Sequence, residues 1–452
     1  MQFEDPDHLI AFLDEEGIRF HKVGVFDTDG VFRGKYMDRD KFESALRKGF
    51  GFCDVVLGWD SADQLFDNTQ VSGWHTGYRD APVSLDLGTV RRVPMEEDTI
   101  LVIGQFDGDY EGVCPRRLLQ RVIGKANSMG YFAQASLEYE FFVFNETPQS
   151  ARAKGYRDLE TLTPGMFGYS MLRSGVHAEL YHELLETMDA LECPIEGLHT
   201  ETGPGVIEAA LHYDEALAAA DKGALFKTFT KILAQRMGLM ATFMAKWSNQ
   251  YPGQSGHIHV SLESLESREN VFYDARDPDG LSKTLRHFLA GQVVLMPQLL
   301  PMVCATVNAY RRLVPGMWAP THATWGIENR TTAIRAIPAG PKATRSEYRV
   351  GPADANPYLG IACALASGLW GIENQVELPP MVRGSAYENN NGAEPLPGTL
   401  GEATRRFSDS EVARELFGDA FVDHFAATRD WEDRLARKHV SDWDLARYFE
   451  II

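Results

Sequence analysis

The sequence predicts an α+β protein with at least two domains. Strand-like runs and short helical patterns alternate over the first 110 residues, whereas the remainder combines strands with longer helices. The chain has 452 residues, more than one core requires, and this length favours two or three domains. A hydrophobic share of 44% and a charged share of 24% are typical of an ordinary soluble globular protein.

Charge, cysteines and hydropathy exclude several classes of function. The net charge of −20 argues against a nucleic-acid partner, because phosphate binding requires clustered Lys and Arg. The five cysteines are scattered and form no C-x-x-C pair, so we expect no disulfide framework and no zinc site, and a reducing cytoplasm is the simplest location. We expect no signal peptide and no membrane partner. The most apolar segment, Val293 to Val307, is too short and too interrupted by prolines to span a bilayer, and we interpret it as a buried helix.

Residues 1–110 are the first predicted domain. Apolar spacing between Asp7 and Gly17 predicts a short capped helix, and the polar residues from Asp27 to Gly30 predict a hairpin turn. The other elements expected here are a helix at 39–48 and strands at 22–26, 31–35, 53–57, 82–86 and 99–106. Asp60 follows Trp59 in a polar loop, where the pair either lines a site or is simply a partly buried aromatic beside an acid.

Residues 111–452 are the second, larger predicted domain. Helical periodicity predicts helices at about 115–126, 177–191 and 216–238. The segment between Pro148 and Gly175 is rich in Gly, Pro and charge without periodicity, so we expect a surface loop.

The strand predicted at 137–144 carries two acids on one face. Side chains alternate along a strand, so Glu138 and Glu140 point the same way. Two like charges in a mostly apolar strand are unfavourable unless a cation or a shared proton compensates them. The alternative is a solvated strand face.

Three later motifs repeat this arrangement of potential ligands. Glu201 and Glu208 bracket a Gly-Pro-Gly turn that could bring them to one pocket. His257 and His259 share a strand face and could bind a metal, although such a pair is often structural.

The third motif is Arg345, Glu347 and Arg349. Its two guanidinium groups suit an anionic substrate held beside a metal, because Arg binds carboxylate and phosphate through paired hydrogen bonds. A surface salt-bridge ladder is the alternative.

The order of these motifs resembles that of the glutamine synthetase family over nearly the whole chain. Four further runs support the resemblance: NAYRRLVPG at 308–316, ENRTTAIR at 328–335, PKATRSEYR at 341–349 and ANPYL at 355–359. The resemblance implies a small β-grasp N-terminal domain and a catalytic domain with a curved antiparallel sheet surrounded by helices. It also implies ATP and two or three Mg²⁺ or Mn²⁺ ions. One ion would be held by Glu140, Glu201 and Glu208, and the second by Glu138, His257 and Glu347.

The resemblance extends to the substrates. His259, Arg345 and Arg335 correspond to nucleotide-phosphate contacts, with Ser261 and Tyr213 as possible nucleoside neighbours. Arg312, Arg349 and Gly253 correspond to the site of the amino-acid substrate, glutamate, and Arg330 to a group that stabilises the phosphoryl in transfer. Pro252 stands where the family usually has an Asn that holds the backbone end of the substrate.

The chain departs from glutamine synthetases where they bind ammonium. Trp318 replaces the family's glutamate in the motif after Val-Pro-Gly, and an indole cannot accept a proton but can form an apolar wall. This resembles the glutamate-amine ligases, which make γ-glutamyl amides from polyamines or alkylamines, so we expect a small organic amine as substrate. Two acids are our candidates for recognising and deprotonating the amine, namely Glu328 and Asp60. Glu328 stands where glutamine synthetases have Arg.

Two other functions stay open at this point. The chain could be an ammonium-dependent glutamine synthetase, or a non-catalytic structural relative, although such a relative would be expected to lose metal ligands. The resemblance also implies a homo-oligomer of stacked hexameric rings, a dodecamer, in the cytoplasm.

Overall fold

The computed structural model describes residue 1 and residues 3–452, and its helices and strands assemble around two sheets. The first sheet has six strands in the order β2-β1-β6-β4-β3, with β5 paired to β6. Its strands are β1 Phe20–Phe26, β2 Phe32–Met37, β3 Phe50–Cys53, β4 Asp80–Leu85, β5 Arg91–Arg92 and β6 Thr99–Phe106. β1 runs parallel to β6, and the other pairs are antiparallel.

Helices α1 (Pro6–Glu15) and α2 (Arg39–Lys48) accompany this sheet, and its apolar side chains form a core of their own. Asp5 and Asp38 cap the two helices, as expected for acids that accept from free backbone N–H groups. The predicted strand at 53–57 is wrong in its extent, because the chain pairs only up to Cys53. It then tightens into a 3-10 helix at Asp54–Leu57.

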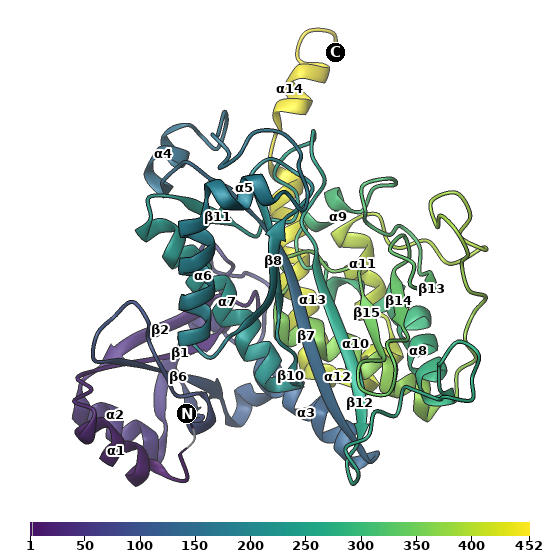
Figure 1. The fold of residues 1–452 in the computed structure, drawn as a ribbon. Helices are drawn as coiled ribbons and strands as arrows, with labels where there is room; N and C mark the ends of the chain where they lie inside the picture. The colour runs from purple at the N-terminus through teal and green to yellow at the C-terminus, as the bar shows by residue number, and fades with distance from the viewer. Residues whose placement is uncertain (2) are drawn as a thin grey trace.

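The second sheet has nine strands in the order β13-β14-β15-β12-β7-β9-β8, with β10 and β11 also paired to β7. The strands are β7 Tyr131–Phe144, β8 Ile195–Thr200, β9 Val206–Leu211, β10 Asp214–Glu215, β11 Met240–Thr242, β12 Gly256–Ser264, β13 Trp325–Ile327, β14 Ile334–Ile337 and β15 Arg345–Tyr348. Figure 1 shows this sheet curling around the long strand β7 with helices packed against it. The sheet is antiparallel as expected, apart from the parallel pair β13–β14.

Helices α3, α7, α8 and α10 cover one face of the second sheet. The helices of this part of the chain are α3 Pro115–Ser128, α4 Pro148–Ala153, α5 Met171–Val176, α6 Ala178–Ala190, α7 Ala216–Arg236, α8 Lys283–Leu299, α9 Ala309–Arg312, α10 Pro357–Glu373, α11 Leu400–Ser408, α12 Glu411–Phe417, α13 Asp419–Lys438 and α14 Asp442–Tyr448. In β7 the side chains at 133, 135, 137, 139 and 141 are buried against these helices, whereas those between them are half-buried on the other face. The second face is therefore free to carry polar groups.

Two expectations for this part of the chain need correction. The segment between Pro148 and Gly175 is not only loop, because Thr147 forms a capping box that starts α4, and α5 begins within the same segment. The apolar helix does not extend to Val307. It ends at Leu299, two residues after Pro297, and a 3-10 turn at Leu300–Met302 follows.

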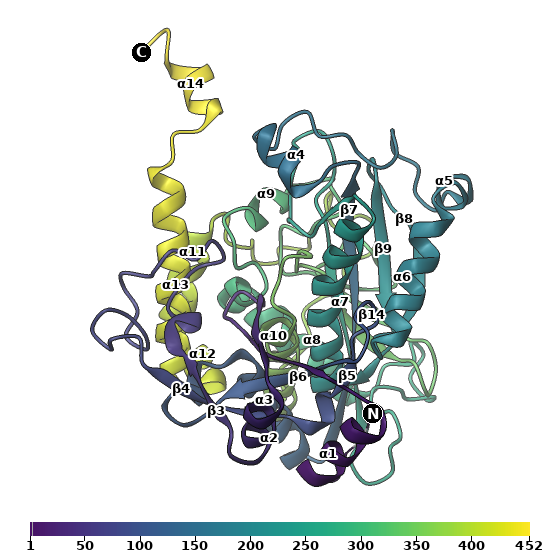
Figure 2. The same ribbon diagram turned by 90° about the vertical axis from the view of Figure 1, so that its left-hand side faces the viewer.

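The last helix, α14, extends away from the body of the molecule in both views (Figures 1 and 2). Among the residues that the structure describes, no helix is both long enough and apolar enough to cross a membrane.

Candidate active site

The strand register brings the predicted ligands into adjacent rows on the free face of the second sheet. Glu140 on β7 lies opposite Glu208 on β9, and Glu138 lies opposite His257 on β12. His259 lies opposite Glu347 on β15. Directly opposed side chains are within reach of one another, so motifs more than 200 residues apart in sequence meet at one place.

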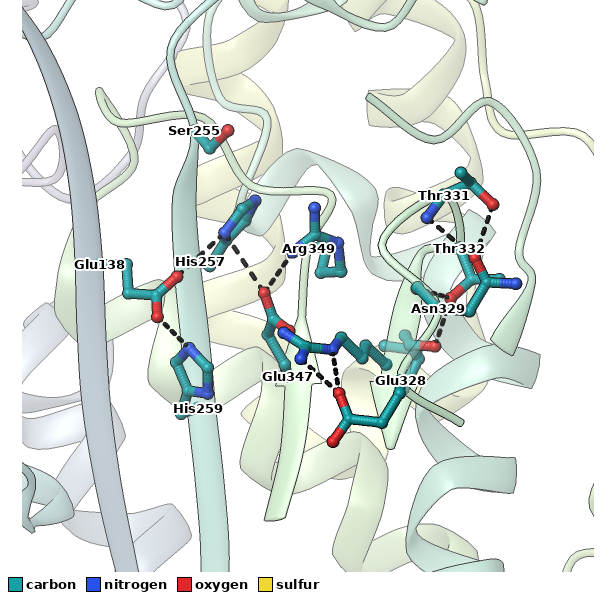
Figure 3. A network of polar contacts seen from close by, with 12 residues as sticks. Glu138, Ser255, His257, His259, Glu328, Asn329, Thr331, Thr332, Glu347 and Arg349 are labelled. Carbon is teal, nitrogen blue, oxygen red and sulfur yellow. Dashed lines mark hydrogen bonds and ion pairs between the residues drawn. The ribbon is translucent and has the colours of Figure 1, made fainter. Parts of the chain in front are cut away.

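Glu138, His257, His259 and Glu347 form the first cluster (Figure 3). The Nδ1 atom of His257 lies 3.2 Å from a Glu138 oxygen and 3.3 Å from a Glu347 oxygen. The Nε2 atom of His259 lies 3.0 Å from the other Glu138 oxygen, so either imidazole could join the two carboxylates around an ion. The predicted set of Glu138, His257 and Glu347 is therefore close together, and His259 is an additional candidate.

Electrostatics keep the two acids of this cluster charged. Glu347 is only 1% exposed, and although burial alone would raise its pKa, the neighbouring His259, His257 and Arg349 lower it to about 2. The pKa of Glu138 is lowered in the same way, against the effect of burial, by His259 and His257. Burial and the nearby Arg349 lower the pKa of His257 to about 4, so its ring is neutral and able to act as a ligand at neutral pH.

Hydrogen bonds distinguish the two histidines. Arg345 donates from Nε to Nδ1 of His259 at 3.1 Å, and Nε2 of the same ring faces Glu138. His257 receives no such bond, and its buried Nε2 has no hydrogen-bond partner. His259 is thus coupled to an arginine at the edge of the first cluster, whereas Nδ1 of His257 points at both carboxylates.

Glu201 and Glu208 form the second cluster, together with His199, which the sequence reasoning missed. Nδ1 of His199 lies 3.8 Å from Glu201 and Nε2 lies 3.8 Å from Glu208. Tyr169 stacks on the imidazole with ring centroids 4.3 Å apart. His199 could have been found, because it precedes Glu201 by two residues and therefore shares its strand face.

Glu140 lies between the two clusters and is oriented by Ser255. The backbone N–H and the hydroxyl of Ser255 donate to the two carboxylate oxygens at 2.8 and 2.9 Å. Burial raises the pKa of Glu140, and burial together with the charges of Glu140, Glu138 and Glu201 raises the pKa of Glu208 to about 9. Divalent cations would neutralise this accumulated negative charge. Carboxylates together with imidazole are a donor set that suits Mg²⁺ or Mn²⁺.

A cavity of about 190 Å³ opens beside the first cluster. Four of the five residues predicted to contact the nucleotide line it, namely Tyr213, His259, Ser261 and Arg345. Its wall also contains Gln134, Glu196 and Lys342, which the sequence reasoning did not single out. Gln134 was missed because β7 begins at Tyr131, before the predicted strand, and no periodic pattern marks the other two.

The fifth predicted nucleotide residue, Arg335, lies on β14 directly opposite Glu347. It donates from Nη1 to Glu347 at 3.0 Å and from Nε to Glu328 at 3.0 Å. Arg349 also pairs with Glu347, so this one carboxylate connects the first cluster to two guanidinium groups.

Of the residues predicted for the amino-acid substrate, Arg312 lies near Glu140, whereas Arg349 pairs with Glu347. Arg312 is 1% exposed, donates to the backbone oxygen of Val350 at 2.9 Å and is attracted by the charge of Glu140. Gly253 lies against it, because a Cβ at this position would come within 2.6 Å of the Ala245 oxygen and 2.7 Å of Arg312 Cγ. Only glycine allows this close approach of the loop to Arg312.

Three predicted residues lie further from the clusters. Arg330 is exposed in the loop after β13. Trp318 is 55% exposed in the loop after α9 and has a left-handed backbone with φ of 58°. Asp60 accepts from the indole N–H of Trp431 at 3.1 Å and from the backbone of Ala62 and Gln64, so within this chain it lies with α13 and not with the two clusters.

Comparison with known proteins identifies the family. Residues 112–448 match the description "Glutamine synthetase, catalytic domain". Similar proteins include type-1 glutamine synthetase 2 of Dictyostelium discoideum, which is 44% identical over 96% of this chain and 84% of its own length. The glutamate-isopropylamine ligase of a Pseudomonas species is 36% identical over 98% of this chain and 97% of its own length.

Further similarities include the γ-glutamylethanolamide synthetase GlnA4 of Streptomyces coelicolor, which is 35% identical over 94% of this chain and 91% of its own length. Among solved structures, that of GmaS without ligand aligns with a TM-score of 0.84 and 26% identity over 98% of this chain and 99% of that one. The relatives thus include two amine ligases as well as glutamine synthetases. The matched domain, the shared fold and these relatives show that this chain belongs to the glutamine synthetase family, in agreement with the amine-ligase resemblance of its sequence.

Proposed function

We propose that the protein is an ATP-dependent ligase that joins the γ-carboxylate of glutamate to an organic amine through γ-glutamyl phosphate, releasing ADP and phosphate. The replacement of the family's ammonium-site glutamate by Trp318 carries this proposal. The similarity to a ligase for isopropylamine and a synthetase for ethanolamide supports it.

The proposed reaction brings two anions together. An oxygen of the glutamate carboxylate attacks the γ-phosphorus of ATP, and the bond to ADP breaks. The nitrogen of the amine then attacks the acyl carbon, and phosphate leaves. Two or three divalent ions held by the glutamates and His257 would neutralise phosphate charge during the first step.

The arginines of the site supply the remaining positive charge. We assign Arg335 and Arg345 to the nucleotide phosphates and Arg330 to the phosphoryl group in transfer, where preorganised donors stabilise developing charge. Arg312 and Arg349, with the loop at Gly253, would hold the carboxylates of glutamate.

The amine must lose a proton before it attacks. An alkylammonium resembles Lys with a pKa of roughly 10.4, so an acid in the site has to bind and deprotonate it. Glu328, which accepts from Arg335, is our first candidate for this acid. Asp60 would act only in the site of a neighbouring subunit, because in its own chain it lies with α13. Trp318 would provide the apolar wall for the organic substituent.

The experiment is a screen of alkylamines, ethanolamine, polyamines and ammonium with glutamate and ATP, read as γ-glutamyl product by mass. We expect kcat/KM to be at least tenfold higher for one of the organic amines than for ammonium. Trp318→Glu should move this preference toward ammonium, whereas Leu265→Glu, a change at an exposed apolar side chain just after β12, should not. Ammonium as the best acceptor in the unmodified enzyme would contradict the proposal.

An ammonium-dependent glutamine synthetase is the second candidate, and the 44% identity to the Dictyostelium protein favours it. A coupled phosphate-release assay with ammonium and the amine panel separates the two. A non-catalytic structural role is a third candidate, and calorimetric titration with Mn²⁺ tests it, since such a protein would bind no ion.

We further propose that the chain works as a homo-oligomer of stacked hexameric rings in the cytoplasm. The exposed apolar side chains of the C-terminal segment support association, because exposed apolar groups gathered on one element commonly mark an interface. They include Val440, Trp443, Leu445, Tyr448, Phe449 and Ile452.

A further inference from the structure

A cavity of about 500 Å³ lies between the N-terminal hairpin and helices α7 and α13. This volume is within the range of roughly 300–1,000 Å³ that small-molecule sites occupy. Residues 28–32, at the turn between β1 and β2, form one wall, and residues of α7 and α13 form others. The described lining residues include none that we assign to metal, nucleotide, glutamate or amine, so this cavity is separate from the candidate active site.

Two lysines on α7 line this cavity without an acid directly beside them. Lys227 and Lys231 are one helical turn apart, and their ammonium groups lie 6.0 and 5.7 Å from the centroid of the Phe243 ring. In the part of the chain that the structure describes, the lysines that form ion pairs are Lys22, Lys125, Lys154 and Lys222. Burial and the like charge of Lys231 lower the pKa of Lys227 to about 7. An anionic group between the two lysines would offset both effects.

Two acids of the same cavity are open to a further partner. Asp354 accepts from Thr306 at 2.9 Å through Oδ2, whereas its buried Oδ1 has no hydrogen-bond partner among the described residues. Burial raises the pKa of Asp354 and of Glu432 on α13, so neither carboxylate is fully compensated by its surroundings. The third acid of the lining, Asp29, is already paired with Arg429 at 2.7 Å. A positively charged group in the cavity would therefore find two acceptors.

We propose that this cavity binds a small zwitterion, such as an α-amino acid. The carboxylate lies between the two lysines of α7, and the ammonium group lies at Asp354 and Glu432. The charged side chains of the lining are three cations and three acids, so a simple anion would also meet the open acids and a simple cation would also meet the lysines. A molecule that carries both charges avoids both repulsions. Oγ1 of Thr28, which is buried without a hydrogen-bond partner in the described structure, offers a further polar contact.

A ligand at this place connects two parts of the molecule. Thr28 belongs to the N-terminal hairpin, whereas Lys227 belongs to the matched catalytic domain. One ligand that touches both stabilises their packing, because it binds the folded protein and not the unfolded chain. The inference goes beyond the proposed function and does not depend on it, since the two sites share no lining residue that we assign to the reaction.

The test is calorimetric titration of the full chain at pH 7, without nucleotide, with three probes. L-alanine carries both charges, propionate lacks the ammonium group and L-alaninamide lacks the carboxylate. We expect L-alanine to bind at least tenfold more tightly than either of the other two. Lys231→Met and Asp354→Asn should each weaken L-alanine binding at least tenfold. Lys222→Met, which removes an ion-paired lysine from the same helix, should leave it within twofold.

Equal affinity for L-alanine and propionate would overturn the proposal, because the cavity would then bind any small anion. Unchanged L-alanine binding in Lys231→Met, or no binding in the unmodified protein, would overturn it too. So would loss of binding in Arg349→Gln but not in Lys231→Met, because L-alanine would then occupy the proposed glutamate site. Thermal unfolding shows which variants are folded, and Lys231→Met, a change at an exposed position, decides the result if Asp354→Asn is not. The amine screen tests the proposed function separately.

Discussion

The most unusual side chains of the molecule are the acids that face one another across β7, β8 and β9. Burial and three neighbouring glutamates raise the pKa of Glu208 to about 9, so this acid holds a proton at pH 7 when no cation is near. A divalent cation must displace that proton to use Glu208 as a ligand. Metal binding at this cluster is therefore coupled to proton release.

Glu208→Gln should weaken Mn²⁺ binding by at least about 100-fold, because the variant loses a ligand. Binding at pH 7 should release about one proton in the unmodified protein and fewer in the variant. Calorimetry in two buffers of different ionisation enthalpy measures both quantities.

Glu263→Gln is the matched control, because this acid lies on β12 outside both clusters and pairs with Arg268. Unchanged Mn²⁺ affinity in Glu208→Gln would exclude Glu208 as a ligand.

Period-two spacing was enough to predict which side chains of the candidate site share a strand face. It placed Glu138 beside Glu140 and His257 beside His259, as the β7–β12 register confirms. It could not predict the pairing of Arg335 with Glu328, because that contact depends on β13 running parallel to β14 and on a left-handed backbone at Glu328. Neither feature leaves a sequence pattern.

Helix α13 shows how one buried titratable group can set acid sensitivity. His424 is 3% exposed, and neither ring nitrogen has a hydrogen-bond partner. Burial, assisted by the charge of Arg429, lowers the pKa of His424 to about 4. The ring thus stays neutral in the folded protein down to about pH 4, whereas in the unfolded chain it takes up a proton below about 6.5.

At neutral pH the ring of His424 is neutral in both states, and the free energy of unfolding falls as the pH decreases from about 6.5 to 4, because only the unfolded chain takes up the proton. His424→Leu should remove this dependence, which amounts to about 3 kcal/mol at most, and should leave the melting temperature at pH 7.5 unchanged or higher. Thermal unfolding at pH 7.5 and pH 5 measures the effect.

His182→Gln, at an exposed position of α6, serves as the control and should retain the acid sensitivity of the unmodified protein. A His424→Leu variant as acid-sensitive as the unmodified protein would show that other groups dominate.

Helices and strands could be predicted from the sequence where one sequence pattern dominated a segment. Apolar spacing marked α1, although Asp5 caps this helix and not Asp7, and β-branched and aromatic residues marked β6. The prediction was wrong at Asp54–Leu57, because an apolar tetrapeptide is compatible with a strand and with a 3-10 turn alike. Tertiary contacts decide between the two.

Over the whole molecule, Arg116 connects the two sheets. From α3, it bonds twice to Asp221 on α7 at 2.9 Å, to Asp86 at 2.7 Å and to Gln105 on β6 at 2.6 Å. Arg116 and Asp221 are both buried, and Tyr358 also donates to Asp221 at 2.6 Å. This network fixes the N-terminal sheet against the helices behind the site.

Arg116→Leu should destabilise the protein by on the order of 3 to 5 kcal/mol, because it leaves Asp221 buried without its cation. Lys125→Met, which removes an exposed ion pair from the same helix, should cost less than about 1 kcal/mol. Denaturant unfolding compares the free energies of unfolding of the two variants. Equal values would show that the Arg116 network does not stabilise the protein.

The protruding helix α14 leads to a prediction about assembly. Deletion of residues 440–452 removes mostly exposed side chains and should change the melting temperature of the body little. The molar mass in light scattering should fall to that of a smaller assembly.

The double change Trp443→Ser and Phe449→Ser should act in the same direction. An unchanged molar mass in both proteins would show that this segment does not hold subunits together.

The cluster of glutamates has one more expected effect, which concerns whether ATP binds alone or as its magnesium complex. The charges that attract Mg²⁺ repel a bare nucleoside triphosphate, so ATP is expected to enter only when its own negative charge is already masked. An excess of ATP over magnesium would then slow turnover by drawing ions out of the protein. The ratio of the two in solution, more than the amount of ATP, would set the working rate.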